Sequence, residues 1–160
     1  MFIFDDVLEE SEVTKYHDFI SNHYKKMVSL GHDPKHWYPT RNVKIERDSV
    51  VTKIKEFIES KVRVKLTMGD AEMQTWHVGS LSHPHVHDDK GRQGGDYNSL
   101  LYLNDDFGGG EFYTKTGIII KPVKGRLTFF NGRETYHGLN PVQGNHRHTI
   151  IVWWKNTEFY

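Results

Sequence analysis

The sequence predicts a mainly β fold with flanking helices, built on a double-stranded β-helix core of the jelly-roll or cupin-like kind. Seven short strand-like runs follow one another after residue 61, and Gly, Asn, Asp and Pro turn signals separate them without intervening helical patterns. Two helical patterns precede these runs. We therefore expect a single domain over 1–160, with a helical part at 1–61 and the jelly-roll core at 62–160.

The first helical pattern lies in ESEVTKYHDFISNHYKKM, behind Ser11 as the expected N-cap. Its expected apolar face consists of Val13, Tyr16, Phe19, Ile20 and Tyr24. A second helix is expected to begin near Ser49. Its apolar face consists of Val51, Ile54, Phe57 and Ile58. Both helices should then pack against one sheet from outside.

The segment between the helices, 29–48, contains two prolines, a glycine and no clear period, so we expect a loop. Within it, Trp37 and Tyr38 are aromatic, and exposed aromatics in a long loop are costly unless they cover something. The loop is then either a mobile lid that closes over a bound peptide or a structural loop whose aromatics dock permanently on the core.

The strand pattern begins with VRVKLTM, whose alternate residues are apolar, as in a half-buried strand. The alternating residues are Val62, Val64, Leu66 and Met68. The later runs are MQTWHV, SLLYLN, GEFYT, GIIIK, GRLTFF and HTIIVWW. Short strands in this succession are typical of antiparallel sheets packed face to face.

Composition excludes several classes of function. Lys plus Arg and Asp plus Glu both total 21, so the formal charge is zero and there is no basic footprint for nucleic acid. The chain has no cysteine, so any metal must be held by His, Asp or Glu. The start, MFIFDDVLEE, has no basic region of a signal peptide, and no segment approaches the length that spans a bilayer. We expect a soluble, cytoplasmic monomer with no membrane partner.

The stretch HPHVHDDKG contains more imidazole and carboxylate groups than one metal ion needs. Residues two apart on an extended strand point to the same side, so Asp88 should face away from the others. The shared face would consist of His83, His85, His87 and Asp89. The His-x-Asp pair of His87 and Asp89 would supply one nitrogen and one oxygen, and the third ligand must come from a distant strand.

His137 lies between two strand runs, fifty positions after His87. Two imidazoles and one carboxylate on one side of a metal form the facial triad of non-haem Fe(II) oxygenases. Arg147 follows ten residues later, at the start of HTIIVWW. A lone cation on a barrel strand needs an anionic partner, and a planar guanidinium suits a carboxylate held by two hydrogen bonds. The anion could belong to a ligand.

Over residues 74–155 the sequence resembles the 2-oxoglutarate and Fe(II)-dependent dioxygenases, and among them the prolyl 4-hydroxylases, including the oxygen-sensing type. In that resemblance His87 and Asp89 match the family's His-x-Asp pair, and His137 matches the distal histidine. Arg147 matches the basic residue that holds the far carboxylate of 2-oxoglutarate. The resemblance thus implies one iron site and one co-substrate site.

Three further positions enter through the same resemblance. Tyr102 in LLYLN matches the tyrosine that hydrogen-bonds the far carboxylate, and Trp153 falls where oxygen-sensing prolyl hydroxylases carry a tryptophan near the active site. FGGGEFY looks like the family's Gly-Gly-Glu turn. His77 stands where those enzymes carry a tyrosine that contacts the co-substrate, which implies a changed hydrogen bond. The simpler alternative for Tyr102 and Trp153 is core packing.

The letters PHVH offer a second register, in which His85 is the first ligand and His87 stands where the aspartate belongs. Alignment on LLYLN and on His77 favours His87 with Asp89, because only that register retains a carboxylate. The remaining histidines are expected at the surface or behind the metal ligands. They are His83, His85, His146 and His148.

The resemblance implies an Fe(II)- and 2-oxoglutarate-dependent hydroxylase, with ascorbate as a further cofactor, that releases succinate and CO2. It favours a prolyl residue in a peptide or protein as the substrate. One alternative is hydroxylation of a free amino acid or another small molecule. Another is a non-catalytic cupin-like metal-binding module, which would have no need for Arg147 and Tyr102. Nucleic-acid demethylases share the triad, but a neutral chain argues against a nucleic-acid partner.

Overall fold

A computed structural model describes residues 1–26, 28–30, 40–45, 49–87 and 96–157 of the chain, and within 28–30 and 40–44 only the backbone. The helices are α1 (Glu10–His23), the 3-10 turn η1 (Tyr24–Lys26) and α2 (Ser49–Lys61). All strand pairs in the described residues are antiparallel. The expected jelly-roll core with flanking helices is confirmed.

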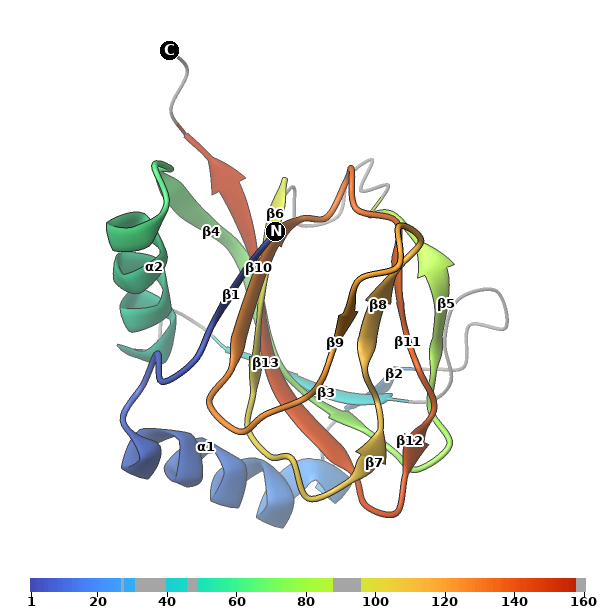
Figure 1. The fold of residues 1–160 in the computed structure, drawn as a ribbon. Helices are drawn as coiled ribbons and strands as arrows, with labels where there is room; N and C mark the ends of the chain where they lie inside the picture. Colours follow the sequence, from blue (N-terminus) through green and yellow to red (C-terminus); the bar gives the residue numbers. More distant parts are fainter. Residues whose placement is uncertain (27, 31–39, 46–48, 88–95, 158–160) are drawn as a thin grey trace.

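The strands form a large sheet, a smaller sheet and a short ribbon. The large sheet has the order β1 (Phe2–Phe4), β10 (Leu127–Asn131), β6 (Tyr97–Tyr102), β13 (Arg147–Asn156), β4 (Leu66–Trp76), β3 (Thr40–Lys44) and β2 (Val28–Leu30). The smaller sheet has the order β5 (Ser82–His85), β11 (His137–Leu139), β8 (Phe112–Thr114) and β9 (Ile119–Ile120). The ribbon pairs β12 (Val142–Gln143) with β7 (Gly108–Gly109). Figure 1 shows the smaller sheet facing the large one across the barrel.

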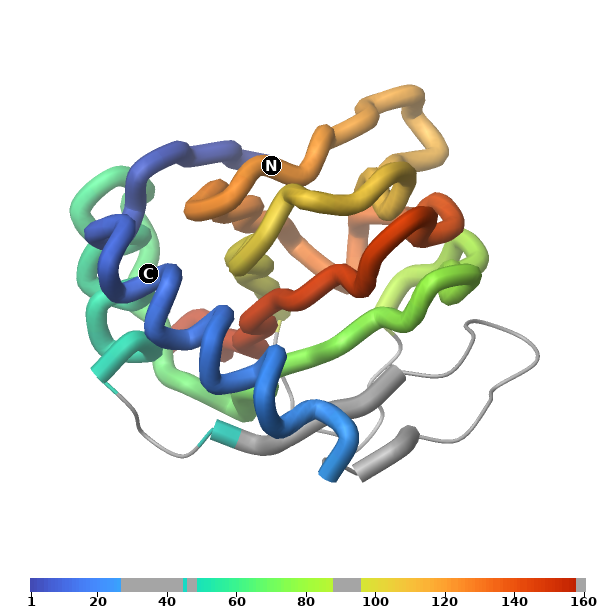
Figure 2. Tube along the Cα trace, turned by 90° about the horizontal axis from the view of Figure 1, so that it is seen from below, coloured from blue at the N-terminus to red at the C-terminus, as the bar shows by residue number. Residues whose placement is uncertain are grey.

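Both helices pack on one face of the large sheet, as expected (Figure 1). The view turned by 90° in Figure 2 shows α1 and α2 together on one side of the molecule. Between helices and sheet lies the main apolar core, in which Ile20 of α1 and Ile54 of α2 are fully buried. Burial of an Ile side chain contributes about 1.5 to 3 kcal/mol. The helices therefore anchor the large sheet and leave its other face to the smaller sheet.

Strand β13 shows how alternation separates the two faces. Ile150, Val152 and Trp154 point into the core beneath the helices. Arg147 and Ile151 point to the opposite side, into the space between the two sheets. A one-residue step along the strand thus decides whether a side chain supports the fold or enters the barrel.

Two details of α1 were predicted wrongly. The helix begins at Glu10, and its N-cap is Glu9, whose carbonyl oxygen accepts hydrogen bonds from the amides of Glu12 and Val13. Ser11 therefore lies inside the first turn rather than at the cap. Phe19 is exposed rather than buried, and its ring stacks on the ring of His23 at 4.6 Å.

The expected loop at 29–48 is partly wrong, because β2 and β3 occupy its two ends. Strand β3 pairs with β4 along 40–44 and extends the large sheet. Backbone pairing along an existing sheet edge needs no apolar alternation, so residues 40–44 carry little sequence signal for a strand. The aromatics Trp37 and Tyr38, and with them the lid hypothesis, lie outside the described residues.

Other differences concern strand lengths. The two runs VRVKLTM and MQTWHV were expected as separate strands, but Leu66–Trp76 forms one continuous strand, β4. Strand β1 at the N-terminus was not expected, and it pairs with the edge of β10.

Within the described part of the chain, no helix is long and apolar enough to cross a membrane.

Candidate functional site

A cavity opens between the inner faces of the two sheets and encloses about 570 Å³, part of it continuous with solvent. Its polar lining combines imidazoles with a guanidinium. The polar and aromatic residues of the lining include His85, His87, His137, Arg147, Gln74 and Trp153. Leu100, Phe112, Phe130 and Ile151 supply apolar walls. The arrangement resembles a ligand site in general form, since it is mostly apolar with a few convergent polar groups.

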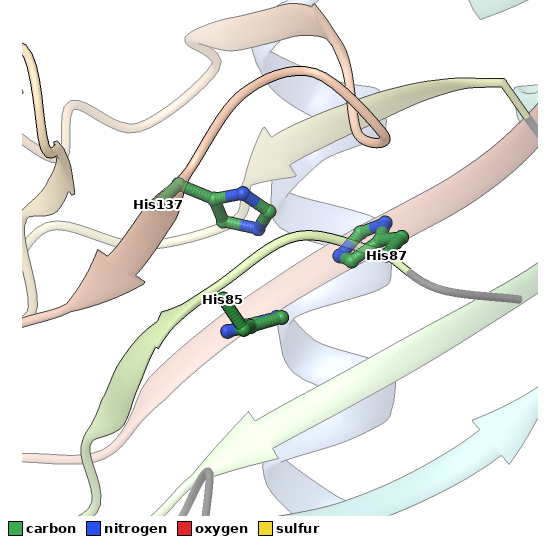
Figure 3. A group of neighbouring side chains, drawn as sticks. All are labelled: His85, His87 and His137. Carbon is green, nitrogen blue, oxygen red and sulfur yellow. The ribbon is translucent and has the colours of Figure 1, made fainter.

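Three histidines meet at one end of this cavity. His85 is on β5, His87 follows β5 by two residues, and His137 begins β11, which pairs with β5. One ring nitrogen of each lies within 4.8 Å of the others, so the group could hold a metal ion. Figure 3 shows His137 projecting from β11 toward the other two rings. His87 and His137 are the two histidines that the sequence predicts as ligands.

The expected shared face of the motif is altered by a bulge in β5. His137 of β11 pairs with His85, and Leu139 pairs with Ser82, so two residues of β5, His83 and Pro84, face the single residue Gly138 of β11. The extra residue shifts the alternation. Ser82 and His85 both line the cavity, and His83 is exposed. The prediction that His83 shares the ligand face is therefore wrong.

Hydrogen bonds fix the orientation of the two predicted ligands. Nδ1 of His87 lies 2.9 Å from Oδ1 of Asn98, and Nδ1 of His137 lies 2.7 Å from the carbonyl oxygen of Thr135. Because both partners are oxygen acceptors, Nδ1 donates the hydrogen bond and Nε2 carries the lone pair. Metal-ligating histidines characteristically have this arrangement.

The electrostatic environment keeps His137 neutral. Burial lowers the pKa of His137 to about 3; the hydrogen bond to Thr135 opposes this effect, and the neighbouring imidazoles of His85 and His87 add to it. A neutral imidazole is the form that binds a metal. The donor chemistry of this cluster therefore fits a transition-metal ion such as Fe(II).

Gly132 allows His87 to come this close to Asn98. A Cβ atom at Gly132 would overlap Oδ1 of Asn98 and would lie 2.6 Å from Nδ1 of His87. The backbone of Gly132 also accepts a hydrogen bond of 2.9 Å from the amide of His87. A glycine is needed here for space and not for an unusual backbone angle.

Of the predicted metal ligands, Asp89 lies outside the described residues, as does Asp88. Of the predicted set His87, Asp89 and His137, the described structure therefore shows only that the two histidines lie close together. The structure adds His85 at the same place, a residue that was expected at the surface or behind the ligands.

Arg147 lines the same cavity as the histidines. Its side chain is 1% exposed, and its guanidinium carbon lies 5.8 Å from the ring centroid of Trp76 and 5.1 Å from that of Tyr102. Within the described part of the chain it forms no ion pair. Burial lowers the pKa of Arg147, but a guanidinium stays protonated in proteins. A buried cation without a carboxylate partner is suited to an anionic ligand.

The polar atoms around Arg147 support an anion site. Five buried side-chain atoms on β6, β10 and β13 have no hydrogen-bond partner among the described residues: Nε of Arg147, Oη of Tyr102, Oγ1 of Thr128 and Thr149, and Nδ2 of Asn98. Thr149 is the direct cross-strand neighbour of Tyr102. Burial raises the pKa of Tyr102, while the charge of Arg147 opposes this effect, so the hydroxyl keeps its proton. A carboxylate of 2-oxoglutarate would satisfy these donors.

The two remaining predicted positions differ in location. Trp153 lines the cavity, and its neighbour Trp154 is fully buried on the helix side, where its indole N–H donates to Ser99. His77 is not among the described residues that line the cavity. Its ring lies 4.9 Å from that of His146 and 5.8 Å from that of Tyr24. A co-substrate contact of His77 stays a prediction.

Sequence reasoning missed Asn98, which orients His87. The signal was present, since Asn98, Leu100 and Tyr102 alternate along β6 and therefore share a face. It also missed Gln74, which lines the cavity from β4. Nothing in the sequence distinguished this buried amide from an ordinary strand residue.

Comparison with known protein families gives one match that covers most of the core. Residues 73–155 match the model of the 2OG-Fe(II) oxygenase superfamily. Among curated proteins, the chain is 40% identical over 72 residues to prolyl 3-hydroxylase 2 of Mus musculus, covering 41% of this chain and 10% of that protein. It is 40% identical over 65 residues to prolyl 3-hydroxylase 3 of Homo sapiens, covering 36% and 9%. The match thus spans about a tenth of the length of these relatives.

Similar solved structures cover nearly the whole chain. A viral collagen prolyl hydroxylase from Paramecium Bursaria Chlorella virus-1, in complex with 2OG, has a TM-score of 0.74 at 20% identity and covers 98% of this chain and 96% of that one. A prolyl hydroxylase from Trichoplax adhaerens, in complex with a peptide fragment of the hypoxia inducible factor oxygen degradation domain, has a TM-score of 0.76 at 18% identity and covers 97% and 83%. At such identities the likeness shows the shared fold.

Proposed function

Because the chain belongs to the 2OG-Fe(II) oxygenase superfamily, we propose that it is an Fe(II)- and 2-oxoglutarate-dependent hydroxylase that acts on a prolyl residue in a peptide or protein. One observation carries the proposal: a cluster of imidazoles lines the same cavity as a buried guanidinium that has no carboxylate partner among the described residues. A metal-binding module without turnover would need only the imidazoles.

The metal ligands in this proposal are His87, Asp89 and His137. Nε2 of each histidine would bind the ion, because Asn98 and the carbonyl of Thr135 hold the opposite ring nitrogen. When bound, Fe(II) and 2-oxoglutarate would supply the oxidative chemistry, with O2 as the oxidant: one oxygen atom of O2 goes into succinate as the co-substrate loses CO2, and the other converts a C–H bond of the substrate into C–OH.

The chain's own contribution is binding and orientation. Arg147 would hold the far carboxylate of 2-oxoglutarate with two parallel hydrogen bonds, and the Tyr102 hydroxyl would donate a third. Their placement on the paired strands β13 and β6 would orient the co-substrate relative to the histidines. The apolar walls around Phe130 and Ile151 exclude bulk water from the reacting atoms.

A proline-containing peptide is the substrate class that the relatives favour. The curated relatives are named prolyl 3-hydroxylases, and one structural neighbour is bound to a peptide. Trp153 at the cavity wall offers an aromatic surface on which a proline ring could pack. The curated relatives are named prolyl 3-hydroxylases, whereas the sequence motifs resemble those of prolyl 4-hydroxylases, so product analysis must decide the position of the new hydroxyl.

The test is succinate formation from 2-oxoglutarate in the presence of Fe(II) and ascorbate, with and without a proline-containing peptide. We expect peptide-stimulated succinate release and 3- or 4-hydroxyproline in the hydrolysed peptide. His137→Ala should abolish both, and His83→Ala, which removes an exposed imidazole of the same motif, should leave both unchanged. Release of succinate stimulated by a free amino acid but by no peptide would favour the small-molecule alternative. Metal binding without any succinate would favour a non-catalytic module.

A further inference from the structure

His85 is the third imidazole of the cavity, and the proposed hydroxylation assigns it no role. Its ring centroid lies 4.6 Å from that of His137 and 5.4 Å from that of His87. His85 pairs directly with His137 across β5 and β11, and it lines the cavity together with His87, two residues further along the chain. Figure 3 shows its ring in the same space as the other two.

The hydrogen bonds of His85 match those of the two proposed ligands. Nδ1 lies 2.8 Å from the carbonyl oxygen of His83 and 3.3 Å from Oγ of Ser82. Since a carbonyl oxygen only accepts, Nδ1 donates, and Nε2 carries the lone pair. All three imidazoles are therefore held as the tautomer that binds a metal through Nε2.

Three neutral imidazoles form a cation site without help from a carboxylate. A metal–nitrogen distance of about 2.1 Å requires the three nitrogens to lie within roughly 4 Å of one another. The ligand atoms here lie within 4.8 Å of one another, so metal binding would draw them together by less than about 1 Å. Imidazole sets of this kind bind Zn(II), Cu(II), Co(II), Ni(II) and Fe(II) and not Mg(II) or Ca(II).

We propose that His85, His87 and His137 form a three-imidazole site that holds a divalent transition metal without Asp89, so that His85 is a reserve metal ligand. The proposal rests on the proposed function only in that two of its residues are shared with the hydroxylase site. Loss of the carboxylate removes one negative charge near the ion, so the three-imidazole site binds the metal more weakly than the complete site.

The experiment measures Co(II) binding in the absence of 2-oxoglutarate to four proteins: the parent, His85→Ala, Asp89→Ala and the double variant. We expect His85→Ala to weaken binding about threefold or less in the parent and about thirtyfold or more in the Asp89→Ala background. The tenfold difference corresponds to a coupling of about 1.4 kcal/mol, which is ordinary for two groups that act on one site. His83→Ala in both backgrounds is the matched control.

A spectroscopic count of nitrogen ligands separates ligation from a structural effect. Cu(II) bound to Asp89→Ala should show hyperfine coupling to three imidazole nitrogens, and Cu(II) bound to the double variant should show coupling to two. The His85→Gln substitution repeats the test with a side chain of similar length, in case the alanine variant fails to fold. An equal effect of His85→Ala in both backgrounds, or two imidazoles in Asp89→Ala, would overturn the proposal.

The outcome is independent of turnover. If the parent binds Co(II) with the expected coupling but forms no succinate, the hydroxylase proposal fails and the reserve-ligand proposal stands. If the parent hydroxylates a peptide and Asp89→Ala shows no binding that depends on His85, the reverse holds.

Discussion

Arg147→Met should weaken the binding of 2-oxoglutarate without lowering the stability of the unliganded protein. The substitution keeps an unbranched side chain of similar volume but removes the guanidinium, whose Nε has no hydrogen-bond partner among the described residues. The Arg147 side chain is only 1% exposed, so its positive charge is almost completely removed from solvent. Its contacts with the rings of Trp76 and Tyr102 recover part of that desolvation cost.

The expected loss of affinity follows from this burial. Without Arg147, a bound 2-oxoglutarate carboxylate would be buried without its charge partner, which costs about 2 to 5 kcal/mol. The dissociation constant of 2-oxoglutarate should therefore rise by about thirtyfold to a few thousandfold. In the unliganded protein, the substitution breaks no ion pair among the described residues. Replacing a buried charge by an apolar side chain of similar volume often leaves stability unchanged or raises it. The melting temperature of the unliganded variant should stay within a few degrees of the parent.

Two measurements on Co(II)-loaded protein check these expectations. Calorimetric titration gives the affinity for 2-oxoglutarate without turnover. Thermal melts with the ligand at a hundredfold excess over the parent dissociation constant should add about 2.7 kcal/mol to the parent, or about 5 to 10 °C, and almost nothing to Arg147→Met. Co(II) binding should be unchanged, because Arg147 is no metal ligand.

A change in 2-oxoglutarate affinity below about threefold, which is well under 1 kcal/mol, would refute the assignment of Arg147. A large drop in the melting temperature of the unliganded variant would also refute the reasoning, because it would show that the cation stabilises the fold by itself.

Three further substitutions follow from the same structure. Tyr102→Phe should raise the 2-oxoglutarate dissociation constant about tenfold without lowering the melting temperature, since its buried hydroxyl lacks a partner among the described residues; Tyr97→Phe, on the helix side of the same strand, is the control, and equal affinities would contradict the role. Gly132→Ala should weaken Co(II) binding about tenfold or more because the added Cβ displaces His87 from Asn98, and unchanged binding would show that this hydrogen bond is dispensable. His148→Gln should flatten the pH dependence of stability in the metal-free protein. Burial and the imidazoles of His17 and His146 lower the pKa of His148 from 6.5 to about 4, so its stabilising effect is present above pH 6.5 and is lost as the pH falls toward 4. Between pH 7 and pH 5 this amounts to about 2 kcal/mol, measurable by urea unfolding, and an equal slope in parent and variant would contradict it.

The layered fold was accessible from the sequence because strand alternation is a local signal. The pattern of HTIIVWW places Ile150, Val152 and Trp154 on one side of β13, and the structure buries these three residues beneath the helices. The same alternation predicts that Trp153 and Trp154 face opposite ways, which is confirmed. Strand β3 was missed because its presence depends on pairing with β4 and not on its own pattern.

The candidate site could be predicted only in part from the sequence, because some of its features depend on pairing between strands. His137 and Arg147 were predicted from their spacing and from the strand in which each lies, and both line the cavity. Parity alone predicts His85 on the ligand face, and it was excluded only because the alignment favoured the register that keeps a carboxylate. His83 was predicted on the same face because the alternation along β5 was assumed to run without interruption. The bulge between Ser82 and His85 is a property of the pairing with β11, and a single strand's sequence does not reveal it.

Isotope labelling of the product tests the central claim most directly. The purified protein is incubated with Fe(II), 2-oxoglutarate and a proline-containing peptide under ¹⁸O₂, and both succinate and peptide are analysed by mass spectrometry. The account predicts one ¹⁸O atom in succinate and one in a hydroxyproline of the peptide, with neither label formed by His137→Ala. Succinate release with no labelled hydroxyl on any prolyl residue would contradict the account.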